Sequence, residues 1–98
     1  MDVEYRSQKI RKCCEDASIA SRQYGLEMAE KLQQRIQEFR AFDSVEQLIR
    51  FRIGRCHELK GNRKSQYAVD LVQPFRLVFE NKGNDIQIVK VMEIVDYH

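Results

Sequence analysis

The stretch that decides the fold is residues 66–95, which read QYAVDLVQPFRLVFENKGNDIQIVKVMEIV. Apolar and polar residues alternate along much of it, at the two-residue period of β-strands. This pattern and a shorter run before it predict four strands, over 55–59, 66–72, 75–80 and 85–95. Turn-forming residues separate them: Gly61-Asn62, Gln73-Pro74 and Lys82-Gly83-Asn84. Because the connections are short, we expect an antiparallel meander.

The same alternation assigns faces to the two central strands. Two sets of apolar side chains each share a face: Tyr67, Val69 and Leu71 on one strand, and Phe75, Leu77 and Phe79 on the next. Both sets are apolar enough to pack against helices. Arg76 must then point away from them, and a sheet with helices on one side leaves its other face or its end available for a ligand.

The first half of the chain has helical spacing instead. Its periodicity predicts a short strand over 2–6 and helices over 7–15 and from 18 or 21 to 41. Ser44, followed three residues later by Gln47, predicts a capping box and a short third helix. We therefore expect an α+β fold in one domain, residues 1–98. An N-terminal strand and two to three helices would pack on one face of a mostly antiparallel, twisted sheet of four to five strands.

The composition limits the possible classes of protein. With 98 residues and 43% hydrophobic residues, we expect one core that folds without disulfide or metal staples. The three cysteines form no CxxC pair and the chain has two histidines, so we expect no metal site and no cofactor. No apolar run approaches the ~18 residues that span a bilayer, and no apolar signal stretch opens the chain. We therefore expect a cytoplasmic protein that does not enter membranes.

Basic residues concentrate in one segment, although the net charge of the chain is +2. Within residues 50–64, six cations accompany a single acid, Glu58; they are Arg50, Arg52, Arg55, Lys60, Arg63 and Lys64. Such a density of positive charge can bind phosphates. A solvated basic surface beside a turn would have the same composition, so the charge alone leaves both interpretations open.

Several residues of the second half suit the cleavage of an RNA phosphodiester. That reaction needs a proton acceptor, a proton donor and cations on the phosphate, but no cofactor. The candidates are His57 and His98 for proton transfer, Lys60 and Arg76 for the phosphate, and Tyr97 for stacking on a base.

Each candidate also has an ordinary structural explanation. His57 can be a surface imidazole, Arg76 can pair with Glu80 or Asp70, and residues 96–98 can be a frayed end. Cys56, beside His57, can be a reactive thiolate, but burial as a small apolar side chain is the favoured interpretation.

Four segments carry a resemblance to a known family: His57-Glu58-Leu59-Lys60-Gly61, Gln66-Tyr67-Ala68-Val69, Phe75-Arg76-Leu77-Val78-Phe79 and Asp96-Tyr97-His98. In order and spacing across residues 54–98 they resemble the HigB (killer) branch of the RelE/ParE toxin superfamily. The resemblance implies a RelE-like fold and an mRNA interferase. Such a bacterial type II toxin enters the ribosomal A site, cleaves the mRNA there without a metal, and is held inactive by a cognate, HigA-like antitoxin.

The resemblance also implies site residues and their roles. Six positions match the motifs of the family: His57, Lys60, Arg76, Asp96, Tyr97 and His98. One histidine would accept the proton of the 2′-hydroxyl and the other would donate one, with Arg76 and Lys60 on the phosphate. Because so small a domain has little surface for reading RNA, affinity would come largely from the ribosome. Five residues are candidate contacts to ribosomal RNA: Arg50, Arg52, Arg55, Arg63 and Lys64.

A second class of function stays open, because a fold alone does not fix an activity. A relative without nuclease activity would act by binding a protein such as DNA gyrase, or as an antitoxin-bound repressor component. The assembled motif set disfavours it. An unrelated RNA-binding module is also disfavoured, since Phe75 and Phe79 are expected to face inward. The chain departs from the family at 8–10 and 18–21, which bears on helix boundaries and the antitoxin surface.

Overall fold

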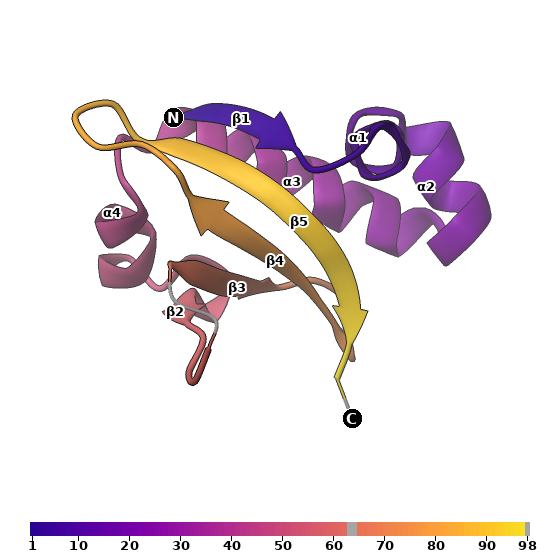
Figure 1. Ribbon diagram of the computed structural model, residues 1–98. Coiled ribbons are helices and arrows are strands. Elements are labelled where there is room, and N and C mark those ends of the chain that lie inside the picture. Colours follow the sequence, from indigo (N-terminus) through magenta and orange to yellow (C-terminus); the bar gives the residue numbers. More distant parts are fainter. Residues whose placement is uncertain (63–64, 98) are drawn as a thin grey trace.

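Helices fill the first half of the chain and strands the second (Figure 1). The computed structural model describes residues 1–62 and 65–97. The helices are α1 (Gln8–Glu15), α2 (Ala17–Tyr24), α3 (Leu26–Ala41) and α4 (Val45–Arg50), with a 3₁₀ turn, η1 (Ile53–Arg55). The strands are β1 (Asp2–Tyr5), β2 (His57–Glu58), β3 (Gln66–Asp70), β4 (Phe75–Asn81) and β5 (Ile88–Asp96). The predicted α+β class is confirmed.

The five strands form one sheet in the order β1-β5-β4-β3-β2. Strands β2 to β5 pair antiparallel with their neighbours in sequence, which confirms the predicted meander. β1 lies parallel to β5 at the edge, with Val3 opposite Val89. In Figure 1 the sheet curves over α3, and the chain ends at the far end of β5.

The largest differences from the prediction concern two elements, and in each case the backbone explains why; the strand expected over 85–95 also begins only at Ile88. The helix expected from 18 or 21 to 41 is divided into α2 and α3 at Gly25, whose φ of 95° and ψ of 164° are outside the helical region. The strand expected over 55–59 is reduced to the two residues of β2. Its predicted first residue, Arg55, belongs instead to η1 and has a left-handed φ of 52°, which an extended strand does not allow.

The predicted helix start at Ser44 is confirmed with a small change in its bonding. The Ser44 hydroxyl accepts a hydrogen bond from the Gln47 N–H at 3.2 Å. The Gln47 side chain reaches back to the N–H of Asp43 at 2.8 Å, one residue before the position that a capping box uses. Both contacts satisfy backbone donors at the start of α4.

The core lies between α3 and the inner face of the sheet. Its sheet side includes the residues predicted to face inward: Tyr67, Val69, Leu71, Phe75, Leu77 and Phe79. Phe39 of α3 meets Phe79 with ring centroids 4.8 Å apart, and both side chains are fully buried. This packing fixes the direction of β4, and therefore the opposite face on which Arg76 lies.

Within the described residues, no helix combines the length and the apolar character needed to cross a bilayer.

Candidate active site at the end of the sheet

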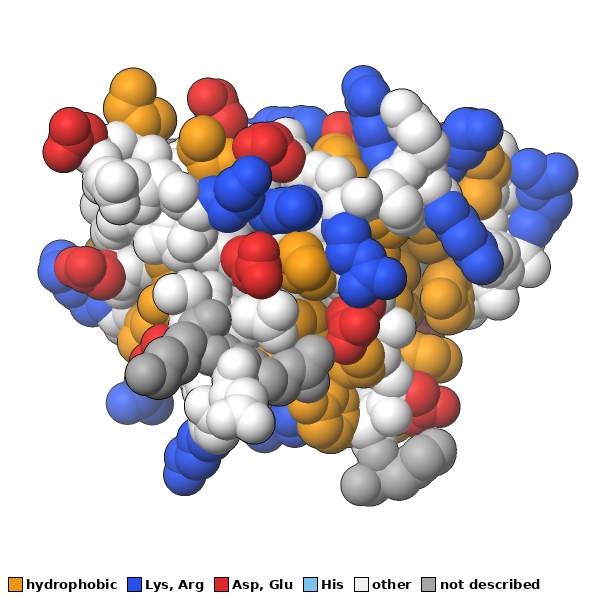
Figure 2. All heavy atoms as spheres, in the orientation of Figure 1, with side chains coloured by type: hydrophobic (Ala, Val, Ile, Leu, Met, Phe, Trp, Pro, Cys, Tyr) orange, Lys and Arg blue, Asp and Glu red, His pale blue; other side chains and the backbone are white. Residues whose placement is uncertain are grey.

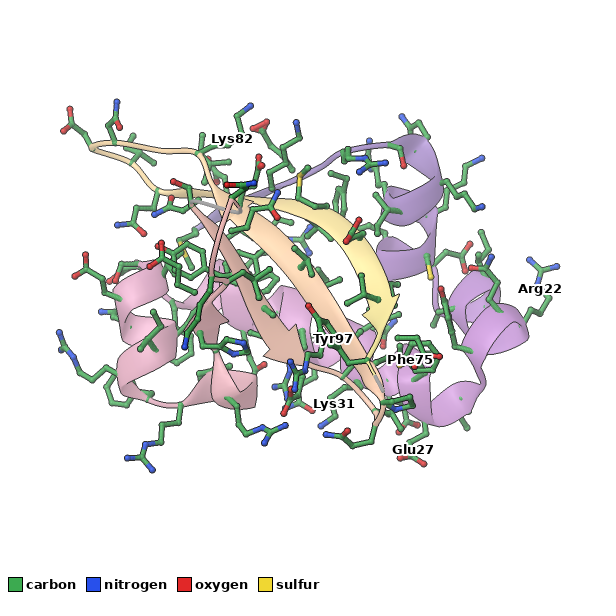
Figure 3. All side chains as sticks on the ribbon, turned by 60° about the horizontal axis from the view of Figure 1, so that its bottom comes forward. Arg22, Glu27, Lys31, Phe75, Lys82 and Tyr97 are labelled. Carbon is green, nitrogen blue, oxygen red and sulfur yellow. The ribbon has the colours of Figure 1, made fainter. Side chains whose placement is uncertain are left out.

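β3, β4 and β5 bring three polar side chains to one end of the outer sheet face. Arg76 is opposite Asp70 on β3 and opposite Val95 on β5. Directly paired residues, and residues two apart on a strand, project from the same face. The outer face therefore carries Asp70, Arg76 and, two residues beyond Val95, Tyr97. Figure 3 shows Tyr97 at this end of the sheet.

Arg76 is held in place by two neighbours. Its Nε lies 3.4 Å from Asp70 Oδ1, so of the two carboxylates proposed from the sequence Asp70 is the partner. Glu80 instead accepts a hydrogen bond from the Gln66 side chain at 3.1 Å. The guanidinium carbon of Arg76 lies 4.5 Å from the centroid of the Tyr97 ring, a cation–π contact.

Tyr97 is not a frayed end. Its backbone N–H donates to the carbonyl of Pro74 at 3.0 Å, which ties the chain after β5 to the turn between β3 and β4. The side chain is 38% exposed, so one part of the ring covers Arg76 and another remains open to solvent. Asp96, the last residue of β5, is exposed and opposite Phe75.

A second arginine reaches the same carboxylate. The Nε of Arg55 contacts Asp70 Oδ2 in a short ion pair, and this hydrogen bond raises the pKa of the Arg55 guanidinium above its ordinary value. Arg55 comes from η1, while Arg76 comes from β4. Asp70 therefore bridges guanidinium groups from two elements, 21 positions apart in sequence.

His57 lies beside this cluster on β2. Its register partner is Ala68, two residues before Asp70, so the imidazole is on the same outer face. Nδ1 is 2.9 Å from the carbonyl oxygen of Arg55. Because a carbonyl oxygen only accepts, Nδ1 carries the proton and Nε2 of the neutral ring is the nitrogen that can accept one.

The remaining predicted site residues are placed as follows. Lys60 is exposed two residues beyond β2, and Arg50 and Arg52 are exposed at and after the end of α4. His98, Arg63 and Lys64 lie outside the described residues. On the face seen in Figure 2, Lys and Arg side chains are interspersed with acidic ones and are most frequent on the side of α1 and α2. Positive charge is thus not confined to residues 50–64.

Cys56 is buried next to His57, as the sequence favoured. It is 6% exposed, and burial raises the pKa of its thiol to about 12. The side chain is therefore a protonated thiol at neutral pH and packs in the core as a small apolar group. Among residues 1–62 and 65–97, no three His, Cys, Asp or Glu side chains are grouped so as to hold a metal ion.

Comparison with known proteins finds similarity among solved structures. No model of a protein family and no curated protein sequence matches the chain. Among solved structures, the chain is similar to a YoeB/ParE toxin from Agrobacterium tumefaciens, with a TM-score of 0.64 and 16% sequence identity over the whole length of both chains. The chain has a RelE/ParE-like toxin fold. At this identity the similarity establishes the fold alone.

The central position of Asp70 in this RelE/ParE-like fold was not predicted. Asp70 was expected as a possible partner of Arg76, whereas Arg55 was expected only among the contacts to ribosomal RNA. A signal was present, because Asp70 and Arg76 both interrupt apolar strands at outward positions. The contact from Arg55 depends on the left-handed turn at η1, for which the sequence carries no comparable signal.

Proposed function

We propose that this protein is a ribosome-dependent mRNA interferase, the toxin of a type II toxin–antitoxin system, which cuts mRNA in the ribosomal A site without a metal. The observation that carries the proposal is Arg76, fixed between Asp70 and the Tyr97 ring at an exposed end of the sheet. The toxin fold and the HigB-like motifs across residues 54–98 support it.

The reaction would be an attack within the RNA chain. The 2′-oxygen loses its proton to a base and bonds to phosphorus, and the bond from phosphorus to the 5′-oxygen breaks as an acid protonates that oxygen. His57 and His98 share these two roles. The hydrogen bond at Nδ1 leaves His57 Nε2 for proton transfer. Arg76 and Lys60 stabilise the charge that develops on the phosphate.

The other residues of the motif would position the substrate. The solvent-exposed part of Tyr97 offers a surface on which a base can stack, while the ring also fixes the plane of Arg76. Asp96 precedes Tyr97 at the end of β5, and it belongs to the site through the D-Y-H motif that it shares with the HigB branch.

Ribosome binding would supply most of the affinity. The candidate contacts to ribosomal RNA stay those named from the sequence: Arg50, Arg52, Arg55, Arg63 and Lys64. A cognate, HigA-like antitoxin in the cytoplasm would hold the toxin inactive. Because arginines and lysines bind phosphates by releasing counterions, affinity for the ribosome should fall steeply as salt rises.

The test compares cleavage of one mRNA, free and on translating ribosomes, by the wild type and three variants. His57→Gln and Arg76→Ala should each cut at least about 100-fold more slowly on ribosomes, while ribosome binding stays nearly unchanged. Arg22→Ala, which removes an exposed arginine from α2, is the matched control and should cut normally (Figure 3).

The possible results separate the two classes of function. Equal cleavage of free and translated RNA would contradict ribosome dependence, and wild-type rates for both site variants would contradict the acid–base chemistry. Growth arrest without any RNA cleavage would favour the alternative, a RelE/ParE-fold protein that acts by binding a protein such as gyrase or as a repressor component.

A further inference from the structure

Two arginines share one carboxylate at the candidate site. Arg76 contacts Asp70 Oδ1 and Arg55 contacts Asp70 Oδ2, each through its Nε. A guanidinium group held at Nε still has an outer edge, formed by Nη1 and Nη2, which matches two oxygens of a phosphate. The Asp70 side chain is 15% exposed, so it lies beneath the two arginines, whose side chains are 68% and 28% exposed.

The backbone of Asp70 is fixed from below by a buried arginine. Arg35 of α3 is 7% exposed, and its Nε donates to the Asp70 carbonyl oxygen at 2.7 Å. Its Nη1 pairs with Glu38 at 2.7 Å. Gly54, the residue before Arg55, packs against the Arg35 guanidinium so closely that a Cβ would lie 2.8 Å from Nε. Arg35 therefore connects α3, β3 and η1 through contacts with Asp70, which holds both arginines, and with Gly54, which precedes Arg55.

The backbone around Arg55 is strained, which is a feature of functional sites. Arg52, Gly54 and Arg55 all have positive φ, at 55°, 55° and 52°. Residues other than glycine rarely adopt this conformation, because it brings Cβ too close to the following carbonyl oxygen. The left-handed turn directs Arg55 onto Asp70, so the strain accompanies the contact that brings the two arginines together.

The charges of the three groups suit a phosphodiester. Two guanidinium groups and one carboxylate leave one net positive charge, and a phosphodiester carries one negative charge. Without Asp70, the two arginines would repel each other and lose the acceptor that orients both. A carboxylate that bridges them keeps them close together before any ligand arrives, which lowers the ordering cost of binding.

We propose that Asp70 is a positioning residue that holds Arg55 and Arg76 side by side as a two-arginine receptor for a single phosphodiester. Its effect on catalysis rests on the proposed RNA cleavage, whereas its effect on phosphate binding does not. The proposal also gives Arg55 a contact with the substrate phosphate.

The binding test uses a probe that the enzyme cannot cut. An RNA dinucleotide with hydrogen in place of its attacking 2′-hydroxyl contains one phosphodiester, and NMR follows the Nε–H signals of Arg55 and Arg76 as it is added. In the wild type, the chemical shifts of both signals should change with the same dissociation constant for the dinucleotide. In Asp70→Asn the two signals should give different dissociation constants, or the Arg55 signal should no longer shift. The proposal would be overturned if the Arg55 signal of the wild type did not shift, or if both signals of Asp70→Asn still gave the same dissociation constant.

The catalytic test separates positioning from general damage to the fold. Asp70→Asn should lower kcat at least about tenfold while KM changes less than about threefold, because ribosome binding supplies most of the affinity for the substrate and the arginines keep their charge but lose their orientation. The control is Glu15→Gln on α1, which breaks another arginine–carboxylate pair, with Arg40 at 2.6 Å, and should cut normally. A kcat for Asp70→Asn within twofold of the wild type would overturn the role.

A double variant checks that Asp70 acts through its partners. In an Arg55→Ala background, Asp70→Asn should cost clearly less than in the wild type, because one of the two groups it orients is already gone. If Asp70→Asn lowered kcat by the same factor in both backgrounds, the result would contradict the proposal. The failures are distinguishable: probe binding without any RNA cleavage rejects the proposed function and retains the receptor. Cleavage that is indifferent to Asp70→Asn rejects the receptor and retains the function.

Discussion

Replacing Gly54 by alanine tests the connection between the core and the site. The new Cβ would lie 2.8 Å from Arg35 Nε and 2.9 Å from Cζ, and Gly54 has a φ of 55°. The left-handed backbone costs an alanine about 1–2 kcal/mol. Pushing Arg35 off the Asp70 carbonyl leaves buried polar groups unpaired, at about 1–3 kcal/mol. We therefore expect Gly54→Ala to lower the free energy of unfolding by about 2–5 kcal/mol.

Urea unfolding of three proteins isolates the contact with Arg35. Gly61→Ala is the matched control, because Gly61 has a φ of 80° with no atom within 4 Å of its would-be Cβ. Its free energy of unfolding should fall only by the cost of the left-handed backbone, about 1–2 kcal/mol. Equal losses in Gly54→Ala and Gly61→Ala would show that Arg35 gives way freely, and would refute the idea that it supports Asp70.

Backbone strain, thiol burial and surface charge can each be tested by a further measurement. Arg52 has φ 55° and ψ 37°, so Arg52→Gly should be more stable than Arg52→Ala by about 1 kcal/mol in urea unfolding, the reverse of the usual order. Burial raises the pKa of Cys14 and of Cys56 from 9.0 to about 12, so the folded state favours their protonated thiols. The stabilisation that this pKa difference gives the folded state is fully present below pH 9 and is lost as the pH rises from about 9 to about 12. The urea midpoint should fall in that range, and less so after Cys56→Ala. The affinity for ribosomes should decrease with salt, and Arg50→Ala should reduce the slope of log affinity against log salt by roughly one; an unchanged slope would remove Arg50 from the contact surface.

The sheet and its faces were predictable because their signals are local. Alternation of apolar and polar residues identified β3 and β4, and it placed Phe79 inward and Arg76 outward, as the structure confirms. The parallel pairing of β1 with β5 was not predicted, because no short-range pattern links strands at opposite ends of a chain. The break at Gly25 was missed because a lone glycine also occurs inside continuous helices.

For the candidate site, the sequence indicated some of the side chains that meet but not how they are arranged. The motifs named Arg76 and Tyr97, and the structure brings them into contact. Arg55 was expected in a strand and instead adopts a left-handed turn that reaches Asp70. The neighbouring Gly54 packs against Arg35, a tertiary contact between residues far apart in the sequence that no local pattern predicts.

The most direct test of the account is the mapping of new 5′ ends on cellular transcripts after brief induction of the wild type and of Arg76→Ala. If Arg76 holds a substrate phosphate on the ribosome, the wild type should create cuts within translated regions, at a fixed position in the codon, and Arg76→Ala should create almost none. Cuts without codon phase, or the same cuts with both proteins, would contradict it.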